Sequence, residues 1–139
     1  MEKSISKILM GGIYTHLVHM LAGKKPKVWS YEQFGGKINA QRLHPYVIVT
    51  NTDSRIWRSV TFYGAHHRVT LDLMTPEGCS LDDAVSQSDD IIQALHGADF
   101  ILQGHALIEI QHEKADYNII ADKNAYLVRL LFTILTVVD

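Results

Sequence analysis

The chain has 139 residues, of which 47% are hydrophobic and 20% are charged, and its formal net charge is −2. This length and composition predict one globular domain, residues 1–139, that is large enough to bury a core. A net charge so close to zero does not indicate a general binder of nucleic acid or of membrane surfaces. The single cysteine, Cys79, excludes a disulfide within one chain. No apolar run approaches the roughly 20 residues of a membrane-spanning helix.

The first predicted element is an amphipathic helix from Glu2 to Leu21, with apolar residues at the i, i+3 and i+4 spacing of one helical face. Gly12 lies on that face and would permit close approach to a sheet. The next stretch, about residues 22–44, is the least regular part of the chain and is predicted to be a long loop.

Three aromatic residues lie in this loop: Trp29, Tyr31 and Phe34. Two interpretations of them stay open. They pack back onto the core, or they anchor a partner protein, since Trp and Tyr are enriched at interfaces.

Three strands are predicted to follow the loop. The first spans Pro45–Thr50 and ends in a turn at Asn51–Ser54. The second, about Arg55–Tyr63, and the third, His67–Met74, form an antiparallel hairpin whose turn is marked by Gly64.

A second helix is predicted to begin after the N-cap Ser80 and to end at Gly97. Its polar face includes Gln87 and is rich in aspartates, two of which lie in the first turn, where the helix dipole favours them. We interpret this face as solvated, or as the contact for the basic loop of a neighbouring subunit.

A fourth strand is predicted at Ala106–His112, with Ile108 and Ile110 facing the core. The polar stretch Glu113–Asn124 is predicted to be a connection, in which Tyr117–Ile120 extends the sheet.

The last strand, residues 125–138, is the most apolar segment of the chain. Its even-numbered residues form one apolar face, while Leu127, Arg129, Leu131 and Leu135 lie on the other. A strand that is apolar on both faces must be covered twice, so we predict that these four residues form a protein interface, unless the long loop at residues 22–44 folds over them. The fold class is α+β, with a mostly antiparallel sheet of about four to five strands, two helices on one face, and the order α-β-β-β-α-β-β.

Eight histidines raise the question of a metal site. His16 and His19 lie on an apolar helical face. The members of two other pairs, His66 with His67 and His105 with His112, are predicted to lie on opposite faces of a strand. No catalytic, cofactor-binding or metal-ligating set is therefore predicted, and we do not expect an enzyme.

The order of these features resembles the small tail-completion family of long-tailed bacteriophages, prophages and gene transfer agents, which includes tail terminators and tail-to-head joining proteins. Each motif is made mainly of core residues, and the resemblance covers about Ile5 to the C-terminus, nearly the whole chain. After the N-terminal amphipathic helix they are Pro45–Val49, His67–Leu73, Ile91–His96 and Leu127–Thr136.

The resemblance implies a structural virion protein of the tail or neck, assembled in the cytoplasm of a bacterial host. It implies a ring, homo-hexameric in such proteins, at the head-proximal end of the tail tube, with the tail-tube protein and the head–tail connector as partners. Such a ring terminates tube growth, joins the tail to the head, or both. DNA can pass through it without specific recognition, and no membrane and no cofactor are involved. Residues 22–44 correspond to a part that varies in these proteins.

Two other classes of function are kept as alternatives. One is a metal-dependent hydrolase that uses some of the histidines, and the other is a small-ligand-binding α+β module. Metal analysis and a thermal-shift screen with metabolites would distinguish them from a ring-forming protein.

Overall fold

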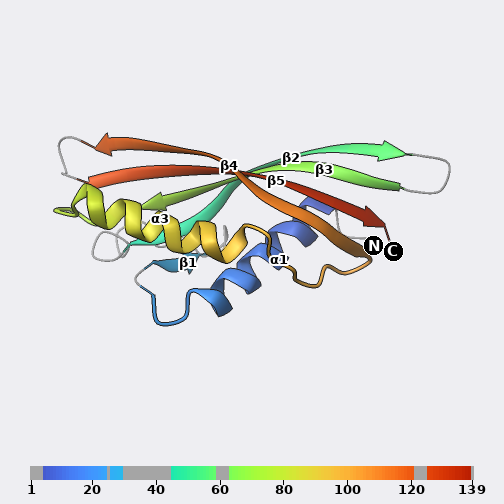
Figure 1. Ribbon diagram of the computed structural model, residues 1–139, viewed down its shortest axis with the longest axis horizontal. Coiled ribbons are helices and arrows are strands. Elements are labelled where there is room, and N and C mark those ends of the chain that lie inside the picture. The colour runs from blue at the N-terminus through green and yellow to red at the C-terminus, as the bar shows by residue number, and fades with distance from the viewer. Residues whose placement is uncertain (1–4, 25, 30–44, 59–62, 121–124, 139) are drawn as a thin grey trace.

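The computed structural model describes residues 5–24, 26–29, 45–58, 63–120 and 125–138 (Figure 1). Two helices and five strands make up this part of the chain. In chain order they are α1 (Ile5–Met20), β1 (Lys27–Trp29), β2 (Tyr46–Arg58), β3 (Tyr63–Met74), α3 (Leu81–Leu95), β4 (His105–Ile120) and β5 (Ala125–Val138).

The five strands form one sheet in the order β1-β2-β3-β5-β4. Strand β1 is parallel to β2, and all other neighbouring strands are antiparallel. Both helices lie on the same side of the sheet (Figure 1). The predicted α+β class is confirmed. The element order also agrees, although its first strand is the unpredicted β1 and β2 spans two strands that were predicted separately. Strand β5 lies between β3 and β4, so the last segment of the chain is an internal strand.

The core lies between the helices and this inner face of the sheet. Helix α1 contributes Leu9, Ile13 and Leu17, all fully buried. Gly12 also faces inward, as predicted, but it approaches a loop and not the sheet. A Cβ at this position would lie 2.6 Å from Leu102 Cδ2 and 3.1 Å from Phe100 Cε2.

Helix α3 begins and ends at the predicted residues. The Ser80 hydroxyl accepts a hydrogen bond from the Asp83 amide at 3.1 Å, which satisfies one unpaired donor of the first turn. Gly97 follows the helix with a φ of 71°, a conformation that glycine adopts without strain. The prediction for Gln87 was wrong, because its side chain is only 5% exposed.

The predicted turn at Asn51–Ser54 does not exist. Strand β2 runs through it, and a register shift between Val49 and Asn51 marks a β-bulge. The polar residues that suggested a turn are instead accommodated in a long, bulged strand. Gly64, predicted to mark the hairpin turn, lies within β3 opposite Trp57. The antiparallel hairpin itself is confirmed.

Strand β1 was not predicted, because it lies in the stretch interpreted as loop. It pairs with only Tyr46–Ile48 of β2. A three-residue strand has no detectable periodicity in the sequence, so only its tertiary partner defines it.

Strand β4 is longer than predicted and contains two bulges. It continues to Ile120, which confirms that Tyr117–Ile120 extends the sheet and shows that Glu113–Asn124 is not simply a connection. The register shift between Leu107 and Glu109 reverses the alternation of faces. Ile108 is therefore 54% exposed, contrary to prediction, whereas Ile110 is buried as expected.

Candidate functional site

The outer face of the sheet, opposite the helices, contains the predicted interface residues of β5. The inward residues Val128, Leu130 and Phe132 are fully buried. On the outer face Leu127, Leu131 and Leu135 are half-buried. The two-sided pattern of this strand thus corresponds to a helix-covered inner face and an outer row of aliphatic side chains.

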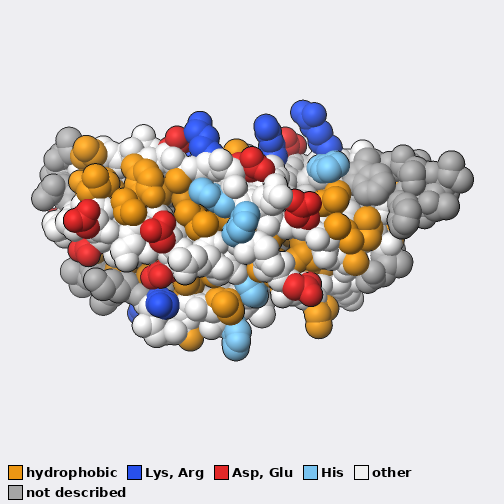
Figure 2. Space-filling view, viewed as in Figure 1, with side chains coloured by type: hydrophobic (Ala, Val, Ile, Leu, Met, Phe, Trp, Pro, Cys, Tyr) orange, Lys and Arg blue, Asp and Glu red, His pale blue; other side chains and the backbone are white. Residues whose placement is uncertain are grey.

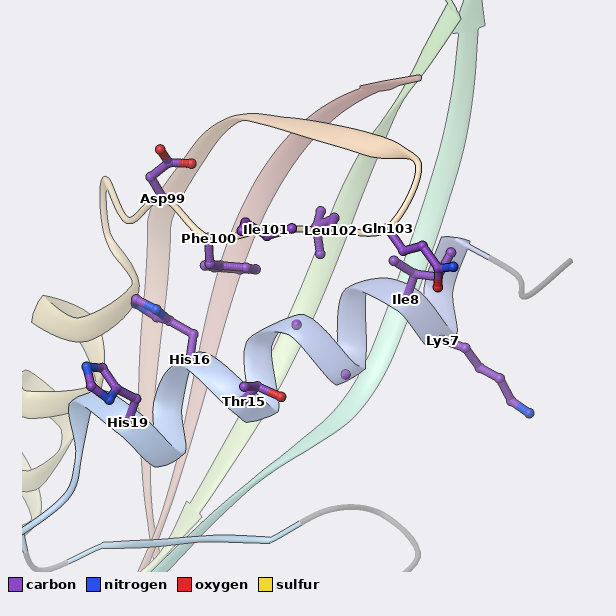
Figure 3. A pocket seen from close by; sticks show the side chains of 12 residues that line it. Lys7, Ile8, Thr15, His16, His19, Asp99, Phe100, Ile101, Leu102 and Gln103 are labelled. Atoms are coloured by element: carbon purple, nitrogen blue, oxygen red, sulfur yellow. The ribbon is translucent and has the colours of Figure 1, made fainter. Parts of the chain in front are cut away.

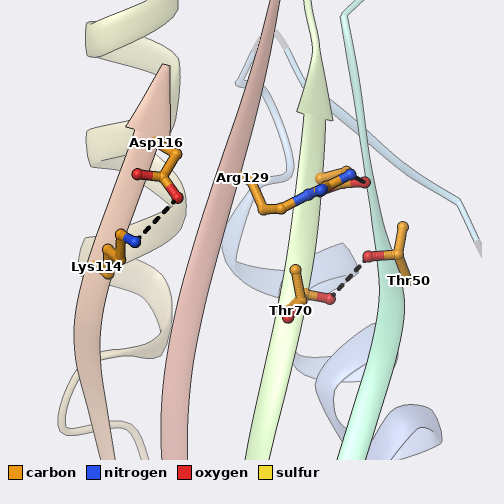
Figure 4. Close-up of polar contacts among 6 residues, drawn as sticks. Thr50, Thr70, Lys114, Asp116 and Arg129 are labelled. Atoms are coloured by element: carbon orange, nitrogen blue, oxygen red, sulfur yellow. Dashed lines mark hydrogen bonds and ion pairs between the residues drawn. The ribbon is translucent and has the colours of Figure 1, made fainter. Parts of the chain in front are cut away.

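Arg129 interrupts this aliphatic row and forms an ion pair with Asp72 of β3. The guanidinium donates two hydrogen bonds to the carboxylate, from Nε at 2.9 Å and from a terminal nitrogen at 3.2 Å (Figure 4). The hydrogen bond to Asp72 and its charge raise the pKa of Arg129. Lys114 and Asp116 of β4 form a second pair, at 3.5 Å. The cation at the centre of the outer face is therefore neutralised within the chain.

The predicted aromatic contacts of residues 22–44 are only partly located. Trp29 ends β1, and its backbone pairs with Ile48 of β2. Tyr31 and Phe34 lie outside the described residues.

A groove of about 630 Å³ lies between α1 and the loop Asp99–Gln103 (Figure 3). Phe100 stacks on the His16 ring, with 4.9 Å between ring centroids. Nε2 of His16 is 2.8 Å from the carbonyl oxygen of Ala94. His16 is thus a packed, hydrogen-bonded residue at the boundary of the core, as its apolar helical face predicted. Ile101 is 95% exposed beside the groove.

The described part of the chain contains no group of three or more His, Cys, Asp or Glu side chains arranged to hold a metal ion. His66 is exposed and His67 is buried, so the prediction of opposite faces is confirmed for this pair. It was wrong for His105 and His112, which pair with Val138 and Phe132 of β5 and so share the inner face. The bulge between the two histidines reverses the alternation.

His67 is the most perturbed titratable group among the described residues. Its ring is 1% exposed and lies 2.7 Å from the Ser54 hydroxyl and 2.9 Å from the Thr136 hydroxyl. Burial, followed by the neighbouring His105 and His66, lowers the pKa of His67 to about 4. A serine–histidine contact can suggest nucleophilic catalysis. Here, however, the second ring nitrogen faces the Thr136 hydroxyl and not a carboxylate that would orient a catalytic base. We therefore interpret the cluster as a structural link between β2, β3 and β5.

The aspartate-rich face of α3 is partly matched by a lysine of the same chain. Lys24 Nζ lies 4.0 Å from Asp90 Oδ1. Asp90 therefore has an ion-pair partner within its own chain. Contact of Asp82, Asp83 and Asp89 with the basic loop of another subunit stays a prediction.

Sequence patterns missed several exposed apolar residues at the margins of the sheet. Ile56 of β2 is 60% exposed, and Ile108 and Ile119 of β4 are 54% and 69% exposed. Of these, Ile108 was predicted to face the core, because neither the bulges nor the lateral position of each strand can be read from the sequence. In Figure 2, Lys and Arg side chains gather at the top of the view, where Figure 1 places the sheet.

The comparisons with known proteins identify the family. The family model of the tail completion protein gp17 matches residues 32–139. The chain belongs to the tail completion protein gp17 family. This membership confirms the resemblance inferred from the sequence and makes the chain a structural protein of a phage-type tail. No curated protein matches it.

The fold has been seen in a solved particle. A chain of the structure titled "Virion of native gene transfer agent (GTA) particle" superposes with a TM-score of 0.74 at 17% sequence identity. The alignment covers 98% of this chain and 99% of that one. At this low identity the similarity establishes the common fold. In the described residues, no helix is long and apolar enough to cross a membrane.

Proposed function

We propose that this tail completion protein assembles into a homo-hexameric ring at the head-proximal end of the tail tube. There it terminates tube growth, joins the tail to the head connector, or does both. The observation that carries the proposal is the aliphatic row Leu127, Leu131 and Leu135 on the outer face of β5. These side chains lie on an internal strand, opposite the helices.

The chemistry of this face favours a protein contact. Aliphatic side chains that stay half-exposed on a central strand are stabilised when another protein surface removes them from water. Arg129 would ordinarily oppose such burial, because an unpaired charge is costly to desolvate. Its bidentate pair with Asp72 lowers that cost, so the row and the ion pair can be covered together.

The partners follow from the proposed position in the tail. Neighbouring copies form the ring, the tail-tube protein contacts one side and the head–tail connector contacts the other. We assign Trp29, Tyr31 and Phe34 of the loop at residues 22–44 to contacts with the tube or the connector. DNA passes through the ring without sequence recognition, and assembly takes place in the host cytoplasm. The proposed role requires neither a cofactor nor catalysis.

The decisive experiment combines mass measurement with imaging. Purified full-length protein is studied by size-exclusion chromatography with light scattering and by negative-stain microscopy, alone and mixed with tail tubes. We expect rings, and a distinct cap at one end of each tube. A protein that is monomeric at high concentration and stays monomeric beside tail-tube protein would overturn the proposal.

The same preparation also tests the two alternatives. Stoichiometric zinc or manganese that is lost in the His16→Ala or His112→Ala variant would favour a hydrolase. A ligand-induced thermal shift, lost when Gly11→Trp fills the groove beside α1, would favour a ligand-binding module.

A further inference from the structure

The two margins of the sheet differ in how much backbone they leave unpaired. At one margin β1 covers only Tyr46–Ile48 of β2. The rest of β2, from Asn51 to Arg58, is bonded to β3 on one side and, in the described part of the chain, to no strand on the other. At the opposite margin β4 has β5 as its only strand partner among the described residues.

Part of the β4 edge is occupied by the segment that follows α3. The Gly97 amide donates to the Ile110 carbonyl at 2.9 Å, and the His112 amide donates to Nδ1 of His96 at 3.1 Å. Among the described residues, this leaves Lys114–Ile120 as the longer stretch of the β4 edge without a strand partner.

Both free stretches expose large apolar side chains on the inner side of the sheet. Ile56, opposite the buried Ala65, is 60% exposed, and Ile119, opposite Tyr126, is 69% exposed. Proteins normally protect a long edge strand with charges, bulges or a covering segment. Exposed isoleucines beside unpaired backbone are therefore the pattern expected of an edge that is paired in the assembled state.

We propose that successive copies of this chain join edge to edge, with Lys114–Ile120 of one copy beside Asn51–Arg58 of the next. This inference rests on the proposed ring and specifies its subunit contact. Strands β2, β3, β5 and β4 alternate in direction. A β4 strand therefore meets the β2 strand of the next copy antiparallel, with the helices of both copies on the same side. In that arrangement Ile56 and Ile119 lie on the same face, and they pack together where the register sets Ile56 opposite Tyr117 or Ile119.

Charge favours a second copy as the occupant of each edge. Strand β4 as a whole carries Glu109, Glu113 and Asp116 against Lys114, although within Lys114–Ile120 the one acid, Asp116, pairs with Lys114 of the same chain. Strand β2 carries Asp53 against Arg55 and Arg58, and therefore has an excess of basic residues. Across the whole strands, contact of unlike edges is therefore favoured over contact of two β4 edges, and Glu109 and Glu113 supply the acidic excess.

The positions of the two stretches also fit a closed ring. The strand register places Arg58, the last residue of β2, at the end of the sheet where β4 begins. Asn118, near the end of β4, lies at the opposite end of the sheet, where β2 begins. Pairing the two free stretches therefore displaces each copy along the strand direction relative to its neighbour. A sheet that closes on itself needs such a stagger together with tilted strands. A head-to-tail contact of this kind forms a ring when its rotation closes.

Cysteine crosslinking of the full chain tests the contact. In a Cys79→Ser background, Ile56→Cys is combined with Ala115→Cys, Tyr117→Cys or Ile119→Cys, which together cover the possible registers. We expect at least one combination to give, on mild oxidation of assembled rings, a ladder of covalent multimers at least tenfold above either single variant. Ile56→Cys with Ile101→Cys is the control, since Ile101 is more exposed than Ile56 or Ile119 but lies in a loop outside the strands.

Each outcome is decisive. Rings without crosslinks in all three combinations would overturn the edge contact while leaving the proposed function intact. Crosslinked dimers of Ile56→Cys alone would also overturn it, because they would show like edges in contact. If neither the unsubstituted protein nor the Cys79→Ser variant forms a ring under any condition, the proposed function fails, and this inference fails with it.

Discussion

The imidazole of His67 on β3 is hydrogen-bonded to the hydroxyl of Thr136 on β5, with 2.9 Å between Nε2 and Oγ1. Its other ring nitrogen lies 2.7 Å from the hydroxyl of Ser54 on β2. One buried side chain thus connects three neighbouring strands of the sheet. Because both contacts are hydroxyl groups and the ring is away from water, the neutral form of His67 is favoured.

This network predicts a stability that depends on pH. The pKa of His67 is about 4 in the folded chain, against 6.5 for an ordinary histidine. Between these values the unfolded chain binds a proton that the folded chain does not, so the free energy of unfolding falls as the pH decreases. The total loss expected from pH 6.5 down to about 4 is about 3 kcal/mol. Urea midpoints measured across this interval give the slope.

The control for this prediction is a pair of adjacent variants. His67→Gln should be less stable near neutral pH and should lose most of the slope. His66→Gln should keep most of it, because burial is the largest cause of the lowered pKa of His67 and His66 the smallest. An unchanged slope in His67→Gln would show that other groups cause the pH dependence.

The outer face of β5 gives a prediction about assembly. Leu131→Asp places a carboxylate in the aliphatic row and should strongly reduce assembly, because the charge would have to be desolvated where the outer face of β5 is covered, a contact separate from the strand edges. Circular dichroism should first show an intact fold. Ile101→Asp makes the same chemical change in an exposed loop and should assemble normally. Equal assembly of the two variants would exclude this row from the interface.

The Arg129–Asp72 pair should contribute little to the stability of the free subunit. The Arg129 side chain is 53% exposed, so solvent screens the interaction. A double-mutant cycle with Arg129→Ala and Asp72→Ala is expected to give a coupling energy of about 0.5 kcal/mol that decreases with added salt. In assembled rings we expect a larger effect, because Asp72→Ala leaves an unpaired cation at the contact. Equal effects in rings and in free subunits would indicate that the pair stays in water.

The adjacent glycines of α1 should respond differently to alanine. A Cβ at Gly11 meets nothing within 4 Å, so Gly11→Ala should stabilise the chain by about 0.5–1 kcal/mol through helix propensity. At Gly12 the new methyl group would lie 2.6 Å from Leu102, which must then shift. We expect Gly12→Ala to be at least about 1 kcal/mol less stable than Gly11→Ala. Thermal denaturation of both variants measures the difference.

The aromatic residues of the loop at residues 22–44 give the last prediction. The double variant Trp29→Ala and Phe34→Ala should keep its fold and bind tail tubes more weakly, because large aromatic side chains dominate many interfaces. Circular dichroism and co-sedimentation with tubes measure the two effects. An unfolded double variant would place these side chains in the core instead.

Local patterns in the sequence determined much of this fold. The spacing of Leu9, Ile13 and Leu17 specified α1, and Ser80 with Gly97 marked the ends of α3, because capping and helical periodicity act within a few residues. The alternation along β5 identified both its buried face and its outer aliphatic row. The order of these elements also carried the resemblance to the family.

Only the tertiary structure decided where the bulges lie and which strands form the margins. The bulge at Ile108 reversed the faces of His105 and His112, and strand β1 exists only through its pairing with β2. Whether a side chain such as Ile56 is buried depends on the strand beside it, and that neighbour is set by distant parts of the chain. β5 was correctly predicted to be two-sided, but its place between β3 and β4 follows from pairing with residues far away in the sequence.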